Sequence, residues 1–194
     1  MKINTSFHTI SDEDLVAQIV KTKNTILFGV LYDRYIKRVY NKCYGFSTSE
    51  DEAEDLTQEI FIKLFLKLGK YKTKGTSKFS SWLFVFVYNH CVNYVKRNEA
   101  KKIQKQAFRI EDHENIAIDE PSDEDLFQIR VDRLEKVLKL IPPEDKSLLL
   151  LKYKEDISIQ ELAKLLEVGE SAVKMRLKRA KLKVVKIYDK KFKE

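Results

Sequence analysis

Apolar residues recur at helical spacing along both halves of the chain. In the first half this pattern predicts four helices, over residues 12–20, 25–44, 51–68 and 78–101. Two of them begin where a serine stands three residues before an acid, Ser11 with Asp14 and Ser49 with Glu52. A serine in that place accepts hydrogen bonds from the free N–H groups of the first turn, so both pairs indicate helix starts.

The second half predicts four further helices, over residues 131–141, 144–155, 158–167 and 171–188. Pro142 stops the first of these, and Pro143 is well placed as the first residue of the next helix, where a missing N–H costs nothing. Ser158 with Glu161 repeats the capping-box spacing. Five glycines and three prolines in 194 residues are too few for a turn-rich β-sandwich or barrel. The sequence therefore predicts an all-α fold.

Charge divides the chain into three parts. Residues 1–97 carry 15 Lys+Arg against 10 Asp+Glu, and residues 129–194 carry 18 against 11, whereas residues 98–128 carry 4 against 9. Residues 111–125 hold eight acids, no Lys or Arg and no apolar stripe, which predicts a flexible acidic linker. We expect two small helical domains, residues 1–100 and 129–194, joined by a linker over residues 101–128.

The overall charge of the chain favours one class of binding partner. A net charge of +7 and a pI near 9.2 favour a polyanion as the partner.

The longest strongly apolar run, residues 82–88, is far shorter than the roughly 20 residues of a membrane span, and the N-terminal sequence has no apolar core of a signal peptide. Cys43 and Cys91 stand at apolar-flanked helix positions, where we expect buried free thiols in a reducing cytosol.

The last two predicted helices have the pattern of a helix-turn-helix. Ala163 is small where the helices must cross closely, and Leu162, Val173 and Leu177 are spaced to fill the space between them. In this motif the second helix lies in the major groove of DNA. Ten cations against one acid over residues 174–193 suit phosphate contacts. The alternative is a basic, solvated helical hairpin without a DNA ligand.

Two helices of the first half carry further candidate surfaces. The helix over residues 51–68 places acids on one face with large apolar residues beside them, as at protein interfaces, although a solvated acidic face has the same pattern. On the helix after Lys78, one side begins with Trp82 and Phe86, continues with Asn89 and Asn93, and ends in cations. Aromatic rings stack on unpaired bases, amides bind base edges and cations hold the backbone, which suits a single strand.

These motifs, in this order, resemble a bacterial family. The acidic helix AEDLTQEIFIKLF, the basic loop, the helix FSSWLFVFVYNHCVNYVKR, the acidic linker and the C-terminal helix-turn-helix resemble the extracytoplasmic-function (ECF) sigma factors of the sigma-70 family. The resemblance extends over residues 10–187. It implies that the first domain is sigma region 2, that the last is sigma region 4, and that the chain is not an enzyme.

The resemblance also implies three sets of functional residues. The docking set, expected on the clamp helices of core RNA polymerase, is Glu54, Asp55, Gln58, Glu59 and Ile62. The melted-strand set, expected on the −10 element, is Lys72, Lys74, Lys78, Phe79, Trp82, Asn89, Asn93, Lys96 and Arg97. The recognition set, expected on the −35 element, is Ser171, Lys174, Met175, Arg176, Lys178 and Arg179.

The expected partners follow from the same resemblance. They are core RNA polymerase, promoter DNA and an anti-sigma factor, with no cofactor, no metal and no small-molecule substrate. The chain would be cytoplasmic, or held at the inner membrane by the anti-sigma factor. A free-standing helix-turn-helix regulator stays open as an alternative. A nuclease is the weakest alternative, because His8, His90 and His113 form no metal set with the acids.

Two positions depart from the family pattern. Glu167 stands where a turn glycine is common, with Gly169 following, so a left-handed backbone is expected at a residue with a side chain. Met175 stands where a small polar residue is common, which weakens base reading at that position.

Overall fold

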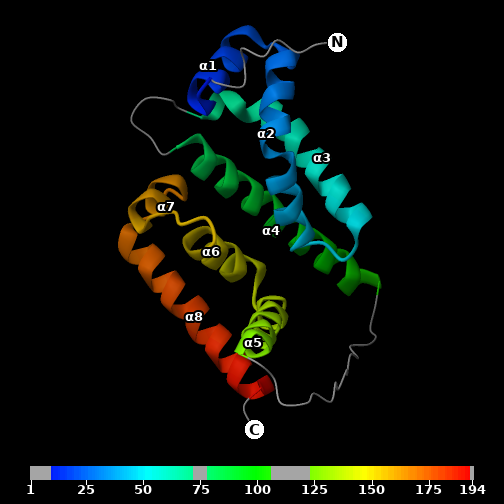
Figure 1. The fold of residues 1–194 in the computed structure, drawn as a ribbon, viewed down its shortest axis with the longest axis vertical. Coiled ribbons are helices and arrows are strands. Elements are labelled where there is room, and N and C mark those ends of the chain that lie inside the picture. Colours follow the sequence, from blue (N-terminus) through cyan, green and yellow to red (C-terminus); the bar gives the residue numbers. More distant parts are fainter. Residues whose placement is uncertain (1–9, 72–77, 106–122, 193–194) are drawn as a thin grey trace.

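The computed structural model describes residues 10–71, 78–105 and 123–192, and over these residues the chain is helical (Figure 1). The first module consists of α1 (Asp12–Thr22), α2 (Thr25–Tyr44), α3 (Glu50–Lys67), a short 3-10 turn over Leu68–Lys70, and α4 (Phe79–Lys105). The second module consists of α5 (Asp123–Leu138), α6 (Pro143–Tyr153), α7 (Ile159–Leu165) and α8 (Glu170–Phe192). The predicted all-α fold is confirmed.

The predicted helix starts at Ser11, Ser49 and Ser158 are observed, whereas the helix predicted over residues 131–141 runs from Asp123 to Leu138. The hydroxyls of Ser11, Ser49 and Ser158 accept hydrogen bonds from the backbone N–H three residues on, which satisfies donors that the helices themselves leave free. Pro143 is the first residue of α6, as expected. Asn24 caps α2 by accepting from the N–H groups of Ile26 and Leu27, a start that sequence analysis placed correctly without assigning the cap.

The acidic segment is partly helical. Helix α4 continues to Lys105, and α5 begins at Asp123, so both ends of the predicted linker over residues 101–128 belong to helices. Composition predicts a flexible chain up to residue 128, whereas the structure begins α5 at Asp123. The middle of the linker, residues 106–122, lies outside the described residues.

The first module packs four helices around one apolar core. Helix α2 contacts α1, α3 and α4, and α3 and α4 contact each other. The core includes Leu15, Leu31, Ile60 and Leu83, each at most 1% exposed. Cys43 from α2 and Cys91 from α4 are buried free thiols, as predicted. Burying apolar surface from every helix is the main force that holds the bundle together.

Within the second module the other helices pack against α8, and α6 contacts the first module. Helices α5, α6 and α7 all contact α8, and α6 lies along α4 (Figure 1). Residues of α6 such as Leu148 and Leu151 belong to the same buried cluster as the core of the first module. The two modules are therefore packed on each other in this structure.

Helix α7 ends in a Schellman motif, from which the turn to α8 begins. The N–H of Val168 donates to the carbonyl of Ala163, and the N–H of Glu167 donates to that of Lys164. Glu167 has a φ of 55°, in the left-handed region, which confirms the expectation for this position. Its side chain is exposed, so burial of that side chain does not offset the cost of the left-handed backbone.

Replacing Glu167 by glycine should stabilise the protein. A left-handed residue with a Cβ costs about 1–2 kcal/mol, part of which is offset by the greater freedom of glycine in the unfolded chain. We expect Glu167→Gly to raise the free energy of unfolding by about 0.5–1 kcal/mol in urea denaturation. Glu167→Ala keeps the strain and serves as the control. An unchanged or lower stability of the glycine variant would contradict the strain.

Candidate nucleic-acid interface

The outer side of α4 has the predicted sequence of aromatic, amide and cationic side chains. Trp82 and Phe86 are half-buried and stack on each other, with ring centroids 5.6 Å apart and planes at 19°. One and two turns further on, Asn89 and Asn93 are exposed. Trp82 also contacts the ring of Tyr71, so the stacked pair is packed against the buried aromatic residues of the first module. This surface offers ring faces and amides on one stable helix.

Phe79 belongs to the core and not to this surface. Its side chain is fully buried between the rings of Tyr35, Tyr71 and Trp82, at centroid distances of 5.8, 5.3 and 5.9 Å. Its assignment to the melted-strand set needs correction, because a buried ring cannot stack on a base. Sequence analysis missed this because a phenylalanine at the first turn of an amphipathic helix fits either side.

The two cations at the end of this surface are held by acids. Arg97 lies 3.7 Å from Glu59, a member of the docking set, and Lys96 forms an ion pair with Glu144 of α6. Glu59 also accepts from Lys63, and this bond keeps the pKa of the Glu59 carboxyl below its usual range. Lys78 is exposed, whereas Lys72 and Lys74 lie outside the described residues.

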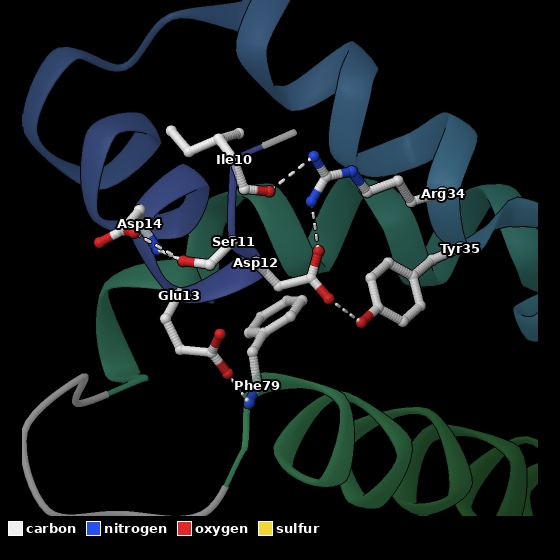
Figure 2. A network of polar contacts seen from close by, with 8 residues as sticks. All are labelled: Ile10, Ser11, Asp12, Glu13, Asp14, Arg34, Tyr35 and Phe79. Atoms are coloured by element: carbon white, nitrogen blue, oxygen red, sulfur yellow. Dashed lines mark hydrogen bonds and ion pairs between the residues drawn. The ribbon is translucent and has the colours of Figure 1, made fainter. Parts of the chain in front are cut away.

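A carboxylate of α1 holds the first residue of α4 in place (Figure 2). Glu13 accepts a hydrogen bond of 2.9 Å from the backbone N–H of Phe79, one of the donors that a helix start leaves free. Beside it, Asp12 pairs with Arg34 at 2.6 Å and accepts from the hydroxyl of Tyr35. Burial is the main cause that raises the pKa of Tyr35, and the bond to Asp12 adds to it. Helix α1 thus fixes α2 and the start of α4 together.

The acidic side of α3 is exposed and borders an apolar groove. Glu54, Asp55, Gln58 and Ile62 are exposed, whereas Glu59 is half-buried. The groove lies between α2 and α3 and is lined by Thr25, Phe28, Tyr32, Gln58, Phe61, Ile62, Phe65 and Leu66. Leu66 is 75% exposed and was not predicted to belong to this surface. Its spacing of one helical turn from Ile62 is the signal that could have found it.

Helix α8 presents its predicted residues to solvent. All six members of the recognition set are exposed, and Val173, Leu177 and Ala180 face inward. Met175 is 51% exposed, so an apolar side chain stands in the middle of the exposed set. Among the ion pairs between described residues none involves Lys174, Arg176, Lys178 or Arg179. These cations are available to an external anion.

The described part of the chain holds neither a metal-like cluster of side chains nor a membrane-spanning helix. No three or more His, Cys, Asp or Glu side chains there come together as they would around a metal ion. None of the helices over residues 10–71, 78–105 and 123–192 is long and apolar enough to cross a bilayer.

Two family models match the chain in succession. Sigma-70 region 2 matches residues 31–101, and sigma-70 region 4 matches residues 132–184. The chain therefore belongs to the sigma-70 family. Several of its relatives in that family are described as ECF RNA polymerase sigma factors.

Two relatives illustrate the range of coverage. The chain is 30% identical over 154 residues to the ECF RNA polymerase sigma factor SigE of Mycolicibacterium smegmatis, covering 78% of this chain and 57% of SigE. It is 25% identical over 171 residues to the ECF RNA polymerase sigma factor SigW of Bacillus subtilis, covering 84% of this chain and 89% of SigW. The chain thus spans little more than half of SigE and most of SigW.

Solved structures share the fold. CnrH, determined in complex with the cytosolic domain of CnrY, superimposes with a TM-score of 0.62 at 20% identity, covering 94% of this chain and 99% of CnrH. The sigma factor RpoE of Bartonella quintana, determined with the anti-sigma factor NepR, superimposes with a TM-score of 0.57 at 18% identity, covering 86% of this chain and 98% of RpoE.

Removing the Glu13 carboxylate should loosen the start of α4. We expect Glu13→Ala to lower the free energy of unfolding by about 1 kcal/mol, the usual cost of losing a helix cap, and Glu13→Gln to lose less because its amide oxygen still accepts. The measurement is urea denaturation followed by circular dichroism. Glu50→Ala removes an acid from the first turn of α3 and controls for the helix-dipole effect. Equal losses in Glu13→Ala and Glu50→Ala would argue against the bond to Phe79.

Proposed function

We propose that this chain is a sigma factor that binds core RNA polymerase, directs it to promoters and assists DNA melting at the start of transcription. The observation that carries the proposal is the succession of a region 2 match and a region 4 match on one chain, each with its candidate surface exposed. Initiation factors of this family act by binding and not by covalent chemistry, so no catalytic residue is assigned.

The roles of the surfaces follow their chemistry. The exposed members of the docking set, together with the apolar groove beside them, suit a helical partner that is basic and partly apolar, as the clamp helices of polymerase would have to be. The stacked Trp82–Phe86 pair with Asn89 and Asn93 suits bases pulled from the duplex. The recognition set on α8 suits the major groove at the −35 element.

The domain limits and the partners are part of this proposal. Residues 1–100 would act on polymerase and the −10 element, residues 129–194 on the −35 element, and the segment between them as the connection. RpoE of Bartonella quintana was solved with an anti-sigma factor. By analogy we propose that an anti-sigma factor also controls this chain, which it could hold at the membrane.

The alternative of a free-standing helix-turn-helix regulator is not favoured. Such a protein would use α7 and α8 alone and would leave the region 2 match, with its half-buried aromatic and exposed amide side chains, without a role. It would also bind duplex DNA tightly without polymerase.

In vitro transcription tests the proposal directly. Core polymerase with the full chain, on DNA from upstream of its own gene, should give discrete transcripts that core polymerase alone does not give. Asn89→Ala should reduce them about tenfold or more, since a bidentate amide contact to a base edge contributes about 1–3 kcal/mol. Asn41→Ala, on the first module but away from the outer side of α4, is the control. Without protein-dependent transcripts on any upstream DNA, the proposal fails.

Salt dependence tests the recognition helix. Binding of the holoenzyme to −35 duplex DNA should weaken with salt, and the slope of log K against log[salt] should become shallower by about 1 in Lys174→Ala if Lys174 neutralises one phosphate. Lys21→Ala removes an exposed cation at the end of α1 and should leave the slope unchanged. Equal slopes in wild type and Lys174→Ala would remove Lys174 from the phosphate contacts.

A further inference from the structure

A buried ion pair joins the two modules. Glu155 lies in the turn after α6, and its carboxylate is 2.7 Å from the ammonium of Lys42 on α2. The two side chains are only 5% and 6% exposed. The hydroxyl of Tyr88 on α4 lies 3.4 Å from the same carboxylate, and Arg38 lies 3.8 Å from it. One acid of the second module is thus surrounded by groups of the first.

The backbone of this turn presents Glu155 inward. The N–H of Glu155 donates to the carbonyl of Leu150, and the N–H of Ile157 donates to that of Leu151. The next residue, Asp156, has a left-handed φ of 52°, and its side chain is 99% exposed. Two neighbouring acids therefore have opposite surroundings, since one is enclosed by the first module and the other is in solvent.

Lys42 is enclosed on its remaining sides by aromatic rings. Its ammonium lies 4.0 Å from the centroid of Phe84 and 5.9 Å from that of Tyr88. Burial lowers the pKa of Lys42, while the carboxylate of Glu155 acts in the opposite direction. A charge in such a place needs its partner, because an unpaired buried ion is strongly unfavourable.

The packed arrangement cannot reach both promoter elements at once. A compact chain of 194 residues has a radius of gyration of about 16 Å and is roughly 40–45 Å across. The −35 and −10 elements are separated, by their own numbering, by about 25 base pairs, which is about 85 Å of B-DNA. A chain that contacts both must move α6 away from α4, and this separates Glu155 from Lys42.

A second pair connects this movement to the melted-strand surface. Glu144 at the start of α6 binds Lys96, a cation of the melted-strand set. The bond to Lys96 is the main cause that keeps the pKa of Glu144 below its usual range. In the packed arrangement a carboxylate of the second module occupies the place that a DNA phosphate would take.

We propose that the structure is a closed resting arrangement, with Glu155 as the latch that holds the second module on Lys42 and Glu144 as an internal competitor for the DNA phosphate at Lys96. The role of opening in promoter binding rests on the proposed function, whereas closure is a property of the free chain. A buried ion pair suits a latch because both charges regain water on opening, so the pair fixes the closed geometry without making it irreversible.

Single-molecule energy transfer on the full chain, without polymerase, tests the latch. Dyes are attached through Lys21→Cys and Lys186→Cys, both exposed, while the native Cys43 and Cys91 are fully buried and stay unlabelled. The wild type should be mostly closed. Glu155→Gln should raise the ratio of open to closed molecules about tenfold or more, because Lys42 loses its charge partner.

Asp156→Asn is the matched control, since it removes the same charge from the adjacent, fully exposed position. The double variant Lys42→Met with Glu155→Leu removes both charges and should close again, which separates loss of the latch from loss of folding. If Glu155→Gln and the wild type have the same distribution of open and closed molecules, the latch is overturned.

The competitor is tested with a probe that needs no promoter. Glu144→Gln should tighten binding of a short oligo-dT strand to the free chain by about two- to fivefold, the range for one exposed ion pair. Asp156→Asn should not change it. An affinity equal to that of the wild type would overturn the role of Glu144. Because neither assay contains polymerase, a failure of the latch and a failure of sigma activity give different results.

Discussion

Helix α4 is packed from two directions, and the positions of both modules depend on this. Leu83, Val87 and Cys91 are buried in the core of the first module, while α6 of the second module lies along another side, where Tyr88 meets Glu155. The side with Trp82, Phe86, Asn89 and Asn93 is left for an external partner. A helix buried on two sides cannot rotate to expose other residues, so the third side is held rigidly.

The acids of this basic chain organise its cations. Asp12 holds Arg34, Glu59 lies between Lys63 and Arg97, Glu144 holds Lys96, and Glu155 holds Lys42. The exposed pairs among these contribute little to stability in water, but they decide where each long side chain points. The described cations on the first half of α8 have no such acid beside them. Most of the cations held in the described ion pairs therefore belong to the first module, whereas the cations on the first half of α8 stay outside these pairs.

Most of the helices were predictable from local sequence signals, whereas the contacts between residues far apart in the sequence were not. The limits of α2 and the caps at Ser49 and Ser158 follow from signals within a few residues, which is why they were predicted correctly. The burial of Phe79, the bond from Phe79 to Glu13 and the pair of Lys42 with Glu155 join residues far apart in the sequence. No periodicity encodes such partners, because they are set by how whole helices pack. The exposed surfaces were predictable from spacing, but not the acids that hold Lys96 and Arg97.

Trp82 is the only tryptophan of the chain, and it lies on the exposed side of α4 against Tyr71, Phe79 and Phe86. The protein therefore carries an intrinsic fluorophore on the surface that would receive a base. A nucleobase stacked over the indole would quench its emission by direct contact. Separation of α6 from α4 would change the surroundings of Tyr88 on another side of the helix and would leave the indole in its aromatic cluster. The position of one residue thus gives the two events distinct optical signatures.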